Sequence, residues 1–157
     1  NIDYYHVETQ GQIFQRNFGI KKLRPKIKLV CLLDDDHYLL PNALSILLEF
    51  WNKEPHHGAV CFNIVDEPPF KWNFFKYLFQ MTGTGPGQVT RAGCPTRVTH
   101  VVKNIQTKWV MGGATTWRRE ILDQHPYEEW DVGFPENEDV YFSFPLSKYY
   151  SFMVISG

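Results

Sequence analysis

The stretch LVCLLDDDHYLLP, residues 29–41, joins an apolar run to three consecutive carboxylates. An apolar run of this length, bounded by polar residues, is typical of a strand buried in a sheet. In open α/β sheets, ligands bind at the carboxyl ends of the strands, which is where these carboxylates begin. Because side chains alternate along extended backbone, Asp34 and Asp36 are expected on one side and Asp35 on the other. Two carboxylates aimed the same way suit Mg²⁺ or Mn²⁺; the alternative is a solvated acidic turn that binds nothing.

The composition is that of a folded chain without a basic surface. Of the 157 residues, 43% are hydrophobic and 21% charged, and the formal net charge is −1. A chain of this length supports a single domain, which we expect to span 1–157. The charge argues against nucleic acid as a partner, and no apolar stretch reaches the roughly 18 residues of a membrane span. Aromatic residues make up 16%, and their flat faces suit both core packing and stacking on sugar or nucleotide rings.

The cysteines indicate a reducing compartment. Cys31, Cys61 and Cys94 are scattered, without C-x-x-C spacing, which is typical of free thiols rather than of a disulfide framework or a zinc site. We therefore expect a cytoplasmic location. Peripheral association with the inner face of the membrane is left open.

Hydrophobic periodicity predicts alternating strands and helices. The expected strands are 2–7, 29–33, 59–65, 98–102, 108–111 and 152–155, and the expected helices are 12–23, 41–51, 70–81, 117–122 and 139–148. This order favours an α/β fold with a mostly parallel central sheet flanked by helices. Residues 66–99 are rich in Gly, Pro and Thr, and we expect most of them to form a long irregular connection.

Several polar side chains have a plain structural interpretation. Arg16 and Asn17 fall on the polar side of the first expected helix, and His56 and His57 lie in the turn after the second. From the periodicity alone, Arg16 and Asn17 are expected on a solvated helix face, and His56 and His57 are expected to be surface residues rather than ligands. The small residues GGATT, 112–116, let a ligand approach the backbone, and Thr116 could cap a following helix.

Three segments, in this order, resemble the family-2 glycosyltransferases, which are inverting enzymes of the GT-A fold. They are GQIFQRNFGI (11–20), LLDDDHYLLPNAL (32–44), and WVMGGATTWRREIL (109–122) followed by FPENEDVYFSFPLSK (134–148). The resemblance extends over 11–155 and is particularly close to bacterial members that build surface polysaccharides. It implies a GT-A-like, nucleotide-diphospho-sugar transferase fold. The family's N-terminal strands and its C-terminal segment have no counterpart here, so we expect the chain to be an incomplete part of a longer protein.

The resemblance implies a role for each matched residue. Asp34 and Asp36 match the D-x-D pair, with Asp36 as the direct ligand of Mn²⁺ or Mg²⁺ and Asp35 in the variable middle position beside the donor. Asp139 matches the general base that removes a proton from the acceptor hydroxyl, and Glu138 a neighbour that holds the acceptor. The remaining matched positions are Arg16, Gly112, Gly113 and Ala114 on the donor side. Trp117 and Trp130, the latter on the acceptor side, are candidate sugar-stacking platforms, and core packing is the equal alternative for each.

The implied activity is transfer of a sugar from a nucleotide-diphosphate donor to a hydroxyl of a saccharide or glycoconjugate acceptor, with inversion and with a divalent metal. Two alternatives belong to other classes. A non-catalytic carbohydrate- or nucleotide-binding module would keep the fold without turnover. A phosphoryl-transfer enzyme or pyrophosphorylase would use the same acidic cluster, but it needs basic phosphate-binding loops that are not evident here.

Overall fold

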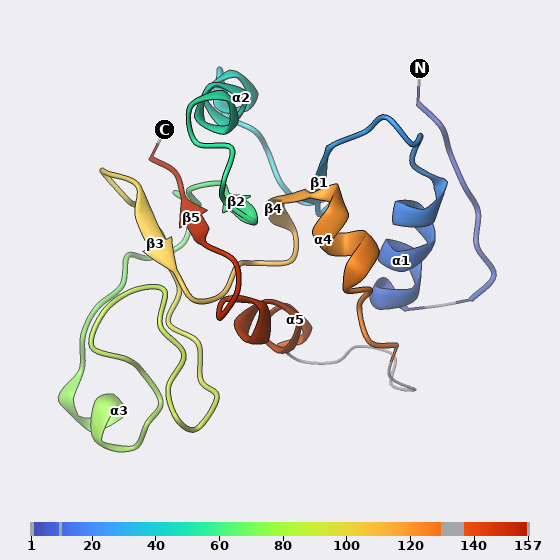
Figure 1. Ribbon diagram of the computed structural model, residues 1–157. Helices are drawn as coiled ribbons and strands as arrows, with labels where there is room; N and C mark the ends of the chain where they lie inside the picture. The colour runs from blue at the N-terminus through green and yellow to red at the C-terminus, as the bar shows by residue number, and fades with distance from the viewer. Residues whose placement is uncertain (1, 10, 130–136, 157) are drawn as a thin grey trace.

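Figure 1 shows the computed structural model, which describes residues 2–9, 11–129 and 137–156. The helices are α1 (Gln12–Lys22), α2 (Ala43–Lys53), α3 (Phe74–Leu78), α4 (Arg119–Gln124) and α5 (Glu138–Leu146). The strands are β1 (Leu29–Leu33), β2 (Ala59–Cys61), β3 (Ile105–Thr107), β4 (Ala114–Arg118) and β5 (Phe152–Val154). The chain is therefore α/β, as the periodicity predicts.

The five strands form one mixed sheet in the order β1-β4-β2-β5-β3. Strand β4 runs antiparallel to both β1 and β2, β3 runs antiparallel to β5, and only the pairing of β2 with β5 is parallel among the described strands. The prediction of a mostly parallel sheet is wrong. The chain reverses direction between β2 and β3, so that β3 and β4 both run opposite to β1, β2 and β5.

Helices cover both faces of the sheet, so the central strands are buried on both sides. Val60 packs with Leu47 and Trp51 of α2 in one apolar cluster, whereas Cys61 packs with Ile121 of α4 in the other. Figure 1 shows α2 on one side of the strands and α5 on the opposite side. Alternate residues of an extended strand point to opposite faces, which explains why all of β2 is apolar and buried.

Several predicted elements differ from the structure. The predicted strand 59–65 ends at Cys61 as β2, and the predicted helix 70–81 is reduced to α3. Residues 2–7 contain no strand, the predicted strand 98–102 is reduced to a single bridge between Ile64 and Thr99, and β3 precedes the predicted strand 108–111. The predicted helix 117–122 begins two residues later, because residues 114–118 form β4. Thr116 is thus a buried strand residue and not a helix cap. Its β-branched side chain, like that of its neighbour Thr115, favours extended backbone.

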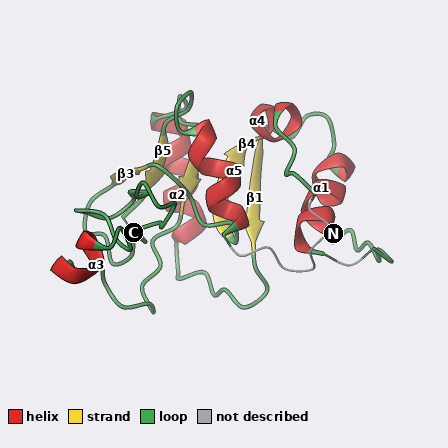
Figure 2. Cartoon of the chain, turned by 90° about the horizontal axis from the view of Figure 1, so that it is seen from below, coloured by secondary structure: helices red, strands yellow, loops and turns green. Residues whose placement is uncertain are grey.

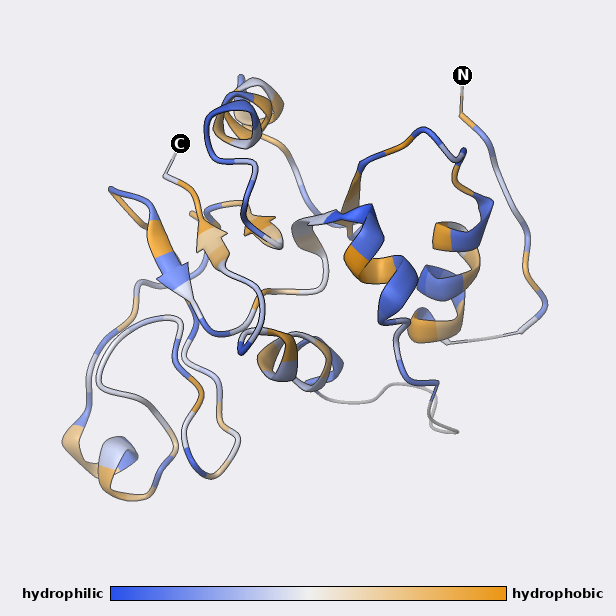
Figure 3. Cartoon of the chain, viewed as in Figure 1, coloured by the Kyte–Doolittle hydropathy of each residue, from blue (hydrophilic) through white to orange (hydrophobic). Residues whose placement is uncertain are grey.

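The connection around α3 lies far from α1, at the β3 end of the sheet. Figure 2 shows α3 and α1 at opposite ends of the molecule. Figure 3 shows apolar residues on this connection, outside the layers that enclose the core. As predicted, most of residues 66–99 is irregular; α3 is a five-residue helix within it.

Candidate functional site

Arg16 of α1 joins two acidic segments that are far apart in the sequence. Its Nη2 lies 3.5 Å from Oδ1 of Asp34, just after β1, and its Nη1 lies 3.0 Å from Oε1 of Glu138, at the start of α5. The side chain of Arg16 is only 9% exposed. The expectation that Arg16 lies on a solvated helix face is therefore wrong: it is the partner that brings the two acidic groups together.

Asn17, the neighbour of Arg16 in α1, is also buried rather than exposed. Its side-chain amide donates to the carbonyl oxygen of Tyr127 at 2.8 Å and to Oε1 of Glu129 at 2.9 Å, and its side-chain oxygen accepts from the Tyr127 amide at 3.0 Å. The Tyr127 ring lies under the Arg16 guanidinium, whose Cζ is 5.8 Å from the ring centroid. Asn17 and Tyr127 thus position α1 and fix Arg16 in place.

Two glycines leave the room that these charged side chains occupy. A Cβ atom on Gly112 would lie 2.7 Å from Nη1 of Arg16, and one on Gly113 would overlap the carboxylate of Asp34. The carbonyl oxygen of Gly113 also accepts the amide hydrogen of Asp34 at 3.0 Å. The side chains of Arg16 and Asp34 therefore occupy the space beside this turn. Ala114, the next residue, is buried in β4 opposite Leu33.

Three side chains that follow β1 lie close enough together to hold a metal ion. Asp34, Asp36 and His37 place one ligand atom each within 4.8 Å of the others. The side chain of Asp36 is 84% exposed and therefore accessible. Nδ1 of His37 is buried and makes no hydrogen bond within the described residues, although Oδ1 of Asp36 lies 3.8 Å away. An orphaned imidazole nitrogen beside two carboxylates fits a divalent cation, and Asp35 is exposed next to it.

A cavity of about 220 Å³ opens beside this set of ligands. Asp36 and His37 line it together with the residues that follow them up to the start of α2, and Asn63 and Asp66 line it from the end of β2. Most of the remaining lining is apolar. The exposed carboxylate of Asp36 thus adjoins a space in which part of a ligand could be held away from water.

Asp139 lies in the first turn of α5, beside Glu138. Burial, and after it the charge of Glu138, raises the pKa of Asp139 above its usual value, while hydrogen bonds from the amides of Val140 and Gly112 and the charge of Arg16 act in the opposite direction. Its Oδ1 accepts from the Val140 amide at 2.8 Å. A carboxylate with a raised pKa is a stronger base than one in water.

One of the two candidate stacking tryptophans, Trp117, lies in the core. Trp117 is 1% exposed and packs edge-to-face with Phe142 and Phe152, whose ring centroids lie 5.2 and 5.3 Å away. Of the two alternatives for Trp117, sugar stacking and core packing, the structure therefore supports core packing, because β4 places its side chain in the core. Trp130 lies outside the described residues.

Sequence patterns missed four residues around the site. Gln12 donates from Nε2 to Oδ1 of Asp34 at 3.5 Å, and His37 supplies the imidazole beside Asp36. Asn17 and Tyr127 support Arg16. A His directly after an acidic run was a usable signal for His37, whereas the roles of the other three depend on partners from distant segments.

The chain belongs to glycosyl transferase family 2, whose family model matches residues 1–125. Membership implies the GT-A fold and glycosyltransferase activity with a nucleotide-sugar donor. The matched part contains Arg16, the three aspartates and the Gly112–Gly113 turn, but it ends before Glu138 and Asp139. Comparisons with curated proteins and with solved structures found no match.

Proposed function

We propose that this glycosyltransferase is a metal-dependent, inverting enzyme that transfers a sugar from a nucleotide-diphosphate donor to a hydroxyl of a saccharide or glycoconjugate acceptor. The observation that carries the proposal is the bridge made by Arg16. The guanidinium of Arg16 pairs with both Asp34 and Glu138. Asp34 belongs to the proposed set of metal ligands, and Glu138 is the neighbour of the buried carboxylate of Asp139. The groups for the donor and the acceptor therefore lie at one place.

The donor is assigned to the side of Asp34, Asp36 and His37. Mn²⁺ or Mg²⁺ held there would stabilise the negative charge that develops on the departing diphosphate. Asp34 is already oriented by Arg16 and Gln12, which leaves the exposed Asp36 as the direct ligand. The Gly112–Gly113 turn leaves the room that Asp34 needs in this orientation, because any side chain on Gly113 would displace its carboxylate.

The acceptor is assigned to the side of α5. Asp139 takes the proton from the acceptor hydroxyl as its oxygen attacks the anomeric carbon of the donor sugar, and the bond from that carbon to the diphosphate breaks. A single displacement, with one base and no covalent intermediate, inverts the anomeric centre. Glu138 is held by Arg16 at 3.0 Å and can bind a second hydroxyl of the acceptor, which orients the attacking one.

The experiment is a transfer assay with a panel of nucleotide-sugars, with Mn²⁺ and with a chelator. We expect donor hydrolysis or transfer to saccharide acceptors with at least one donor, loss of that activity with the chelator, and loss of manganese dependence in Asp36→Ala. Nucleotide binding without turnover of any donor would instead identify a non-catalytic binding module. Turnover that persists in the presence of the chelator would contradict the proposed metal dependence.

We also propose that the enzyme works in polysaccharide or glycoconjugate synthesis of the bacterial surface type, at the cytoplasmic face of a membrane. Residues 71–81 are all exposed and contain no acidic residue. Their exposed apolar side chains are Trp72, Phe74, Phe75, Tyr77, Leu78, Phe79 and Met81. Aromatic side chains flanked by Lys71 and Lys76 suit the interface of an anionic lipid surface. No helix among the described residues is long and apolar enough to cross a bilayer.

A further inference from the structure

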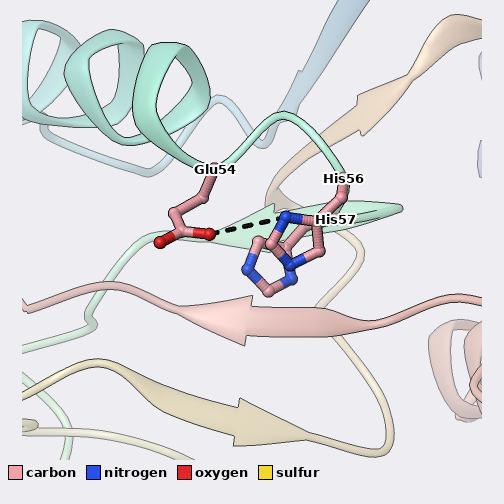
Figure 4. A group of neighbouring side chains, drawn as sticks. All are labelled: Glu54, His56 and His57. Atoms are coloured by element: carbon pink, nitrogen blue, oxygen red, sulfur yellow. Dashed lines mark ion pairs between the residues drawn. The ribbon is translucent and has the colours of Figure 1, made fainter.

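A second group of metal-binding side chains lies in the turn between α2 and β2. Glu54, His56 and His57 place one ligand atom each within 4.8 Å of the others, and Figure 4 shows the three side chains gathered at this turn. We propose that this group, the α2–β2 turn site, binds a divalent transition-metal ion such as Zn²⁺. Two imidazoles and one carboxylate suit zinc and its neighbours better than Mg²⁺ or Ca²⁺.

The α2–β2 turn site is separate from the glycosyltransferase site. Strands β1 and β2 run in the same direction, since both are antiparallel to β4. Asp34 follows the carboxyl end of β1, whereas His57 precedes the amino end of β2. The two groups of ligands therefore lie at opposite ends of the strands. The proposal does not depend on the catalytic assignment.

His57 is already positioned as a ligand. The residue is 4% exposed, contrary to the expectation that it is a surface residue, because its ring stacks on Phe50 of α2 with 5.4 Å between the centroids. Its Nδ1 lies 2.9 Å from Oγ of Ser151. Metal-binding histidines usually have their second ring nitrogen held in this way, so Nε2 is the nitrogen that we assign to the metal.

Glu54 and His56 complete the site from the solvent side. Nδ1 of His56 lies 3.4 Å from Oε2 of Glu54, close to the separation of about 3.4 Å between two ligands of a tetrahedral ion with bonds of about 2.0–2.1 Å. The ring centroids of His56 and His57 are 4.3 Å apart. Because the side chains of His56 and Glu54 are 64% and 50% exposed, small torsional changes can bring them onto an ion beside His57.

The charges around the turn favour a cation. Lys53, the basic neighbour of Glu54, is turned onto Glu49 with 2.6 Å between Nζ and Oε1, so it does not neutralise the Glu54 carboxylate. The turn also follows the carboxyl end of α2, an 11-residue helix whose terminal carbonyl groups carry partial negative charge. A bound ion would connect the end of α2 to His57, whose ring is held by Ser151. Ser151 itself lies just before β5.

The test is titration of Zn²⁺ by calorimetry, together with thermal melting, on tag-free protein carrying Asp36→Ala, which takes one of the three ligands from the other set. We expect one Zn²⁺ per chain and a rise in Tm on binding. Ser151→Ala should weaken affinity by about 10- to 100-fold, as loss of a hydrogen bond to a ligand does. His56→Gln, at an exposed ligand, should weaken it at least as much without unfolding the chain.

The matched control is His6→Gln, which alters an exposed histidine outside the turn and should leave zinc affinity unchanged. Absence of zinc binding in the Asp36→Ala protein would overturn the proposal. So would unchanged affinity in His56→Gln, or an equal loss in His6→Gln, because zinc would then bind to surface histidines without a defined site.

Discussion

At the scale of single residues, Asp139 combines a functional advantage with a cost in stability. Its folded-state pKa is raised, chiefly by burial and then by Glu138, above the ordinary value of 3.8. The stability that protonated Asp139 contributes is present below the unfolded-state pKa and is lost as the pH rises through the folded-state pKa. At neutral pH the protein therefore carries the cost of a partly desolvated carboxylate.

Asp139→Asn should consequently stabilise the protein at pH 7 while it removes the base. We expect a rise in Tm of about 2–4 °C, the shift that about 1 kcal/mol produces in a chain of this size. The gain should shrink as the pH is lowered and disappear below about pH 3.9, where the wild-type carboxyl is protonated in both states. Thermal melting of both proteins between pH 3 and 8 measures it.

A control for this prediction is Asp123→Asn, which alters an exposed carboxylate of α4 whose partner is Arg119 at 3.2 Å. That variant should change Tm little, because exposed ion pairs contribute about 0–1 kcal/mol. A fall in the Tm of Asp139→Asn at pH 7 would mean that the hydrogen bonds and the Arg16 charge outweigh burial at Asp139.

At the scale of elements, the connection around α3 exposes aromatic side chains that suit binding to a membrane surface. Phe75 and Phe79 are 69% and 70% exposed, and water-exposed Phe side chains gain about 1.5–3 kcal/mol each when they are fully withdrawn from water. We expect the protein to sediment with vesicles that contain anionic phospholipid. The double variant Phe75→Ser/Phe79→Ser should bind at least about 100-fold more weakly, as the loss of two such contributions implies.

The matched control is Tyr149→Ser, which changes an aromatic residue that is 80% exposed between α5 and β5. This variant should sediment like the wild type. Equal binding to neutral and anionic vesicles would remove the role of Lys71 and Lys76, and failure to bind either kind would remove the membrane from the proposed function.

The elements also show what local pattern could predict. Local pattern predicted closely where α1, α2 and β1 lie. The apolar stripes of the two helices mark the residues that they bury in the core, and the apolar run marks the strand. The segment 114–118 was ambiguous, since small and β-branched residues before a helix fit either a turn or a strand. Only pairing with β1 and β2 decided it, and that pairing also made the sheet mixed.

At the scale of the whole molecule, the site depends on contacts between distant segments. The position of the acidic run directly after a strand follows from local sequence, but the prediction that this strand is buried is wrong: β1 lies at the edge of the sheet and only Val30 in it is buried. Nothing near Arg16 in the sequence indicates that it meets Asp34 and Glu138, and nothing near Asn17 indicates Tyr127. Likewise, Phe50 and Ser151 bury His57 although its own neighbours are polar. Periodicity does not report such long-range partners.

The most direct test of the central claim is the steady-state kinetics of sugar transfer by Asp139→Asn at saturating Mn²⁺. If Asp139 is the general base and Asp34 and Asp36 hold the metal and donor, kcat should fall by about 10²- to 10⁴-fold. The KM for the nucleotide-sugar should stay within about twofold of the wild-type value, since the base acts on the acceptor and not on donor binding. An unchanged kcat would contradict the assignment of the base, and a KM that rises in step with the loss of kcat/KM would place Asp139 in the donor site.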